Sequence, residues 1–225
     1  LLIEAGGKDT YPGIHIPVGY YKTMHNPKTD WCFKTEPDES INGRSINYPR
    51  GKTLGGSSSI NGLLYIRGQS KDYDIWRQQG NSGWGWEDVL PYFIKSENQE
   101  RGANKFHGVG GPLSVSDIRI KLDILDEFQN AAEEMGIPKI KDFNTGDNFG
   151  CDYFQVTEKN GLRCSTAVAY LNPAKKRSNL KVEVKAHVKQ INFEGKKAVG
   201  ISYWKNGELI TVKANKEVIL SAGSI

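Results

Sequence analysis

A run of glycines and serines at residues 50–62 constrains this chain more than any other feature. It reads Arg-Gly-Lys-Thr-Leu-Gly-Gly-Ser-Ser-Ser-Ile-Asn-Gly, and residues 57–64 are compatible with a helix. Small residues let a phosphate approach the backbone, several N–H groups can converge on it, and a helix N-terminus adds partial positive charge. The run therefore suits an anion, but glycine pairs followed by serines also occur in ordinary loops, so both interpretations stay open.

The flanking segments predict strands, a long loop and helices. Residues 1–4 and the following Ala5-Gly6-Gly7 indicate the end of a buried strand that enters a glycine turn. Residues 11–48 show no sustained period, which predicts a loop on the surface or over another part. Helices are predicted at residues 71–79, at 86–96 with an interruption at Pro91, at 122–135 up to Gly136, and at 165–171, capped by Ser165 and ended by Pro173.

The C-terminal part alternates in the manner of strands. The turn dipeptides Glu194-Gly195 and Asn206-Gly207 separate apolar runs, which predicts an antiparallel meander. The predicted strands are residues 182–184, 188–193, 199–204 and 208–212, with a final strand at 217–221 that runs into Ala222-Gly223.

Composition excludes several classes of protein. With 37% hydrophobic residues among 225, the chain can bury a core, and no stretch reaches the apolar length of a membrane span. Its 30 basic and 26 acidic residues are scattered, so nothing indicates nucleic-acid binding, and the basic cluster at residues 175–177 is interpreted as a solvated turn. Three widely spaced cysteines suggest neither disulfides nor zinc and favour a reducing compartment.

Both ends of the chain are expected to lie inside a longer protein. The chain begins without methionine on the apolar residues 1–3, and it ends shortly after another apolar run at 218–220.

The glycine and serine run, with the positions around it, resembles the first signature of the glucose-methanol-choline oxidoreductases. The positions that carry the resemblance are Gly51, Leu54, Gly55, Gly56, Ile60, Asn61, Tyr65, Gly68 and Asp74. The similarity continues through residues 72–76, 90–93, 107–113 and 165–167, and it is greatest to the choline dehydrogenase and alcohol dehydrogenase branch.

The resemblance implies a mixed α/β fold: an FAD-binding Rossmann-like domain with an antiparallel meander and part of an inserted substrate-binding region. It assigns residues 1–75 and 178–225 to FAD binding, and residues 76–177 to a helical and partial substrate region. The implied enzyme is cytoplasmic, or peripheral to the inner membrane at full length. It oxidises the CH–OH group of a primary alcohol, choline or another, by hydride transfer to flavin N5, with the electron acceptor and oligomeric state left open.

The resemblance also implies which residues bind the cofactor. Glu4 would hold the adenosine ribose, although a strand-end carboxylate facing water is the alternative, and the adjacent Ala5 is also an implied cofactor contact. Val188 would offer its backbone to adenine and Trp31 would cover the cofactor, although both also suit a structural core. The remaining implied contacts are Arg50, Gly51, Leu54, Gly55, Gly56, Ser57, Asn61 and Gly62 in the loop, and Ala222 and Gly223 after the last strand.

Catalytic residues are not expected among residues 1–225. By the resemblance, the pyrophosphate fingerprint lies upstream and the catalytic histidine downstream, so this stretch alone should be inactive. Some relatives attach the flavin covalently through a histidine at the position of Ile60, so FAD should be noncovalent here. The four histidines, His15, His25, His107 and His187, show neither metal spacing nor a partnered acid, and His107 is assigned to turn geometry.

Two other functions fit the same residues. The family includes an FAD-containing hydroxynitrile lyase, which keeps the fold without redox use of the flavin. A non-catalytic binding module is the second alternative, and only the net charge of +4 supports it.

Overall fold

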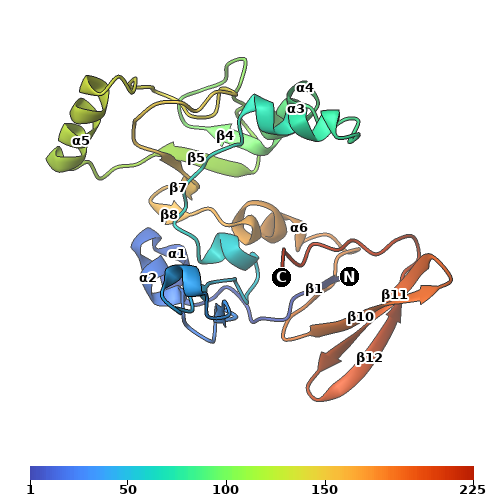
Figure 1. The fold of residues 1–225 in the computed structure, drawn as a ribbon. Helices are drawn as coiled ribbons and strands as arrows, with labels where there is room; N and C mark the ends of the chain where they lie inside the picture. Colours follow the sequence, from blue (N-terminus) through green and yellow to red (C-terminus); the bar gives the residue numbers. More distant parts are fainter. The chain divides into compact units, whose positions relative to one another are not determined.

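The computed structural model describes residues 1–225 as two compact units, shown in Figure 1. The first unit comprises Leu1–Ile14, Gly19–Ile60 and Leu171–Ile225, and the second comprises His15–Val18 and Asn61–Tyr170. Short helices and small sheets occur together, so the predicted mixed α/β class is confirmed. The assignment of residues 1–75 and 178–225 to cofactor binding stays a prediction.

Three groups of strands lie in the first unit, and two of them involve its C-terminal part. Strand β1 (Leu2–Ile3) pairs in parallel with β9 (Val182–Glu183). Strands β10 (His187–Glu194), β11 (Lys197–Lys205) and β12 (Glu208–Lys213) form the predicted antiparallel meander, orange to red in Figure 1. The predicted turn Asn206-Gly207 is confirmed, and both residues adopt the positive φ that such hairpins require. The first hairpin forms as predicted, but its turn residues are Gly195 and Lys196, one position later than Glu194-Gly195, because Glu194 still pairs with Lys197.

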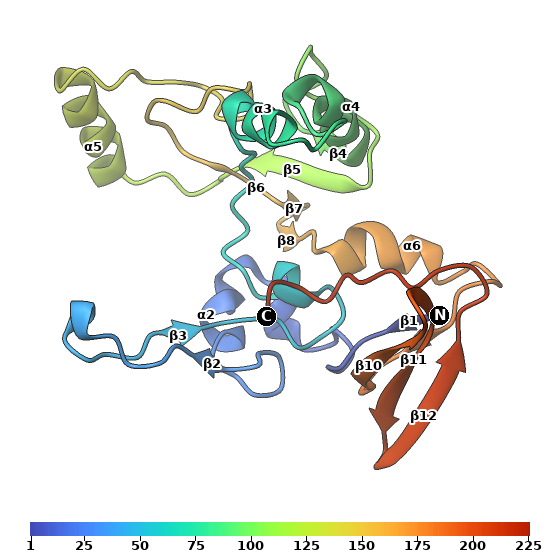
Figure 2. The same cartoon turned by 45° about the vertical axis from the view of Figure 1, so that its right-hand side comes forward.

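The segment that was predicted as one long loop contains short elements. They are α1 (Pro12–His15), the 3₁₀ turns η1 (Pro17–Gly19) and η2 (Glu39–Ile41), helix α2 (Tyr20–Thr23), and strands β2 (Phe33–Lys34) and β3 (Asn47–Tyr48). Strands β2 and β3 pair as an antiparallel ribbon, which is visible in Figure 2. Each element is too short to leave a period in the sequence.

The helix predicted at residues 57–64 is wrong. The glycine loop leads only into a single 3₁₀ turn, η3 (Gly56–Ser59). Serine hydroxyls explain the early end, since Ser58 Oγ donates to the Gly55 carbonyl at 2.6 Å and Ser59 Oγ to that of Leu54 at 2.8 Å. Leu63 then takes a φ of 64°, which no right-handed helix allows.

The three longer helices of the second unit agree with the sequence. They are α3 (Ser70–Gln78), α4 (Trp86–Ser96) and α5 (Asp123–Glu134). Gly136, with a φ of 85°, follows the end of α5 as predicted. The predicted interruption of α4 is wrong, because Pro91 lies inside a continuous helix.

The segment after Ser165 is helical, but Pro173 does not end it. Ser165 Oγ accepts the N–H of Val168 at 3.2 Å, as the predicted cap should. A π-helix, η4 (Ala167–Leu171), is followed by α6 (Asn172–Ala174), where Pro173 occupies the first turn. A proline is tolerated there because first-turn N–H groups have no intrahelical partner.

Five short strands of the second unit were not predicted. Strands β4 (Glu97–Gln99), β5 (Leu113–Asp117) and β6 (Gln155–Val156) form one sheet, and β7 (Glu158–Lys159) pairs with β8 (Leu162–Arg163).

Conversely, the strand predicted at residues 217–221, in the first unit, is absent. No strand of the structure pairs with that segment, and Ile219 and Leu220 are 78% and 73% exposed.

Each unit has a modest apolar core. Ile14, Leu54, Ile60, Ala186 and Tyr203 are buried in the first unit. Leu63, Trp86, Val115, Val156 and Cys164 are buried in the second. Cys32, Cys151 and Cys164 are free thiols, and no helix is both long and apolar enough to cross a membrane.

A buried charge network crosses the second unit and corrects the prediction that His107 has no acidic partner. Glu97 Oε2 pairs with Arg67 Nη2 at 3.1 Å and with His107 Nδ1 at 2.8 Å, and His107 Nε2 contacts Asp142 Oδ2 at 2.8 Å. Burial by itself lowers the pKa of His107, but the hydrogen bonds to Asp142 and Glu97 prevail and raise it to about 9. His107 therefore joins two carboxylates in addition to occupying a glycine-rich turn.

Candidate functional site

Glu4 lies directly after β1, at the start of a tight turn. Its Oε1 accepts the N–H of Gly6 at 2.6 Å, across Ala5. Burial raises the pKa of the Glu4 carboxyl, and the hydrogen bond from Gly6 opposes that rise. The other oxygen has no partner within the chain, so Glu4 presents a half-buried acceptor at a strand end.

Neighbouring segments hold this turn from both sides. The N–H groups of Lys185 and Ala186 donate to the carbonyls of Gly6 and Glu4 at 2.7 and 3.0 Å. On the other side, the Gly7 carbonyl accepts the N–H of Leu54 at 3.0 Å. Thr53 Oγ1 also donates to the Gly7 carbonyl, although the two residues are 46 positions apart in sequence. These contacts bring the strand end and the glycine loop together.

The glycine loop folds back on itself. The N–H of Gly51 donates to Ser57 Oγ at 3.1 Å, and that of Gly56 donates to the Thr53 carbonyl at 2.8 Å. A Cβ on Gly51 would overlap the Gly56 backbone, so only glycine permits this approach. Gly55 and Gly56 have φ of 88° and 54°, in the left-handed region that favours glycine.

This geometry changes how the loop can bind an anion. The N–H groups of Gly51, Leu54 and Gly56 are used inside the chain, and the expected helix N-terminus is a four-residue 3₁₀ turn. The loop is therefore a preformed backbone surface more than a nest of free N–H donors. Open space lies beside Gly56, where an added Cβ meets no heavy atom within 4 Å, so a flat cofactor could approach the loop backbone there.

Trp31 is fixed against the start of the same loop. Its N–H donates to the Arg50 carbonyl at 2.8 Å, and the Lys52 N–H donates to the Thr29 carbonyl at 2.7 Å. The Trp31 ring has Lys52 Nζ 4.4 Å from its centroid and the His187 ring 5.3 Å away. The structure thus brings Trp31, the loop and the start of β10 together, with Lys52 and His187 as neighbours that sequence reasoning missed.

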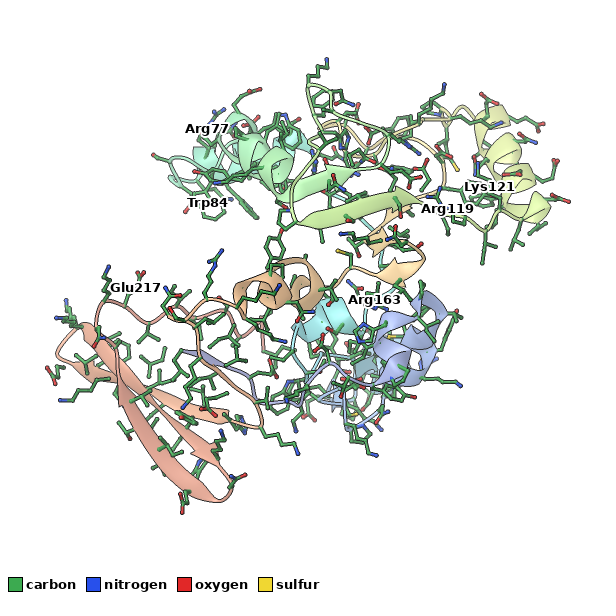
Figure 3. The ribbon with its side chains drawn as sticks, turned by 180° about the vertical axis from the view of Figure 1, so that it is seen from behind. Arg77, Trp84, Arg119, Lys121, Arg163 and Glu217 are labelled. Carbon is green, nitrogen blue, oxygen red and sulfur yellow. The ribbon has the colours of Figure 1, made fainter.

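Asn61 and Gly62 begin the longer stretch of the second unit, Asn61–Tyr170. Asn61 Oδ1 accepts the N–H of Leu63 at 3.1 Å and Nη1 of Arg163 at 2.7 Å. Arg163, labelled in Figure 3, is buried, and its burial lowers the guanidinium pKa to about 10. Asn61 Oδ1 therefore stabilises its own turn, which leaves the side-chain NH₂ group and the backbone as means of contacting a ligand.

The remaining predicted positions differ in how closely they join this site. Val188 lies in β10 beside His187 and is 38% exposed, so its interpretation as a core residue is wrong. Ala222 and Gly223 lie in an exposed segment, because the strand predicted before them does not form. No hydrogen bond links these two residues to the glycine loop.

Comparisons with known proteins agree on one family. The family model described as GMC oxidoreductase matches residues 3–225. Human mitochondrial choline dehydrogenase is 40% identical over all of this chain and 39% of its own length. An alcohol dehydrogenase [acceptor] from Pseudomonas putida is 41% identical over all of this chain and 41% of its own length. The chain thus spans about two fifths of the length of these curated relatives.

Solved structures give the same result. Pyridoxine 4-oxidase from Mesorbium loti matches with a TM-score of 0.89 and 28% identity, over 94% of this chain and 42% of that protein. An FAD-dependent oxidoreductase from Chaetomium thermophilum matches with a TM-score of 0.85 and 28% identity, over 95% of this chain and 39% of that protein.

Proposed function

The chain belongs to the glucose-methanol-choline oxidoreductase family, and from that premise we propose that the whole protein is an FAD-dependent dehydrogenase of a primary alcohol, choline or another. The observation that carries the proposal is the similarity to choline and alcohol dehydrogenases along the entire chain.

Residues 1–225 fit the role of holding FAD. Glu4 presents a carboxylate oxygen suited to ribose hydroxyls, and the open space beside Gly56 allows close approach to the loop backbone. Trp31 donates its N–H to the carbonyl of Arg50, the first residue of this loop. When bound, FAD supplies the hydride acceptor, and the contribution of this chain is to orient the cofactor. Ile60 is buried and carries no nucleophile, so the proposed attachment is noncovalent.

Anaerobic mixing of the full-length protein with choline, and separately with other primary alcohols, tests the proposed reaction. We expect at least one alcohol to bleach the flavin absorbance, because hydride transfer reduces the flavin. A hydroxynitrile lyase would leave the absorbance unchanged with every alcohol. A folded protein that releases no yellow, fluorescent cofactor in acid would instead support a non-catalytic module.

Glu4→Gln in the full-length protein is expected to weaken FAD binding by about 10- to 100-fold, because hydrogen bonds to a charged acceptor are stronger than those to an amide. The FAD dissociation constant of the apoprotein measures the effect. Glu36→Gln, at an exposed carboxylate of the same unit, is the matched control and should bind FAD normally. Normal binding by Glu4→Gln would remove the ribose role from Glu4.

A further inference from the structure

Asp30 is a buried acid to which the proposed function assigns no role. The residue is 1% exposed, and none of the ion pairs in the chain includes it. Backbone N–H groups stabilise its carboxylate instead. Asp30 Oδ2 accepts the N–H of His25 at 2.7 Å, and Oδ1 accepts those of Cys32 and Arg50 at 3.0 and 2.9 Å.

These three donors come from segments that are distant in sequence. Cys32 follows Trp31 and has a left-handed φ of 57°, which an ordinary L-residue adopts only when its surroundings hold it. Arg50 begins the glycine loop, 20 residues after Asp30. Backbone pairing between Asp30 and Gly51 continues the same junction. One carboxylate therefore ties the segment that carries Trp31 to the first residue of the loop.

We propose that Asp30 is a positioning residue of the cofactor site, which sets the place of Trp31 relative to the glycine loop before FAD binds. This inference rests on the proposed function. A carboxylate suits the task because it is an acceptor only, and three N–H groups converge on its two oxygens. No other common side chain of this size offers acceptors on both branches. FAD would then meet a site that is already assembled, so less ordering accompanies binding.

Asp30→Asn in the full-length protein tests this role with little change of shape. The carboxamide keeps one acceptor oxygen, but its NH₂ group would face a backbone N–H. We expect the FAD dissociation constant to rise by about tenfold or more. Thr29→Val is the matched control: its buried hydroxyl donates to the Thr23 carbonyl at 2.7 Å in the same segment without contacting Asp30. It should lower thermal stability and leave FAD affinity within about twofold.

A double-mutant cycle with Trp31→Ala separates positioning from general stabilisation. If Asp30 acts through Trp31, Asp30→Asn should weaken FAD binding much less in the Trp31→Ala background than in the wild type. Should Asp30→Asn fail to fold, the same cycle is run with Asp30→Ser, whose hydroxyl can still accept one N–H.

Three results would overturn the inference. The first is an unchanged FAD affinity in Asp30→Asn. The second is a loss of FAD affinity in Asp30→Asn and Thr29→Val that is proportional to their loss of thermal stability, and the third is additive effects of Asp30→Asn and Trp31→Ala in the cycle. These failures differ from failure of the proposed function. A wild-type protein without FAD affinity would overturn the function itself, whereas equal binding by wild type and Asp30→Asn would overturn only the role of Asp30.

Discussion

Replacing Gly6 with alanine in the full-length protein is expected to weaken FAD binding by about 10- to 100-fold. Gly6 is buried, and an added methyl group would overlap the backbone of Lys52 and Thr53. The turn that carries Glu4 would have to move away from the glycine loop, which separates the two parts of the proposed site. Titration of the apoprotein with FAD measures the loss.

Gly7→Ala is the control for this substitution. An added Cβ at Gly7 meets no heavy atom within 4 Å, and its φ is not positive, so alanine fits without strain. The Gly7 carbonyl still accepts hydrogen bonds from the Leu54 N–H and the Thr53 hydroxyl. FAD affinity should therefore stay within about twofold of the wild type. Equal losses in the two variants would show that chain flexibility, and not the close approach of Gly6, matters at this turn.

The parts of the fold that sequence predicts well are those that local patterns specify. Helices α3, α4 and α5 each keep an apolar period over two or more turns, and the meander has a turn signal at Asn206-Gly207. Each of these elements needs little information from distant residues. The sequence therefore locates them to within one or two positions.

Elements that depend on distant partners were missed. Strand β5 pairs with β4 and with β6, whose residues lie about 15 and 40 positions away, so no short window contains the pairing. The opposite error occurred at residues 217–221, where an apolar run predicted a strand that finds no partner. Strand formation is decided by pairing as well as by composition.

The candidate site divides in the same way. Glycine positions were informative, because close approach at Gly51 and positive φ at Gly55 exclude most other residues. The role of Asp30 was not visible, because its three N–H donors are backbone groups that any sequence provides. The acidic partners of His107 were missed since Glu97 and Asp142 are 10 and 35 residues away.

Arg67→Met is expected to lower the unfolding free energy by about 3–5 kcal/mol, because it leaves a buried charge partly uncompensated. The side chains of Arg67 and Glu97 are 1% and 0% exposed. Arg67 Nη1 also donates to the Phe106 carbonyl at 2.7 Å, which would lose this donor. Denaturant unfolding of the full-length protein, followed by tryptophan fluorescence, measures the change.

Arg77→Met is the matched control, since Arg77, labelled in Figure 3, pairs with Asp74 at 3.1 Å while 50% exposed. The unfolding free energy of Arg77→Met should fall by less than about 1 kcal/mol, and similar losses in both variants would contradict the buried network.

The pH dependence of stability gives a second check on this network. The folded pKa of His107 is about 9, above its usual value, so its stabilisation is complete below the unfolded pKa of about 6.5 and is lost as pH rises through 9. His107→Gln should flatten that decline in stability, and a wild-type protein equally stable from pH 6 to 9.5, roughly the titration range, would show that His107 is not held protonated between the two acids.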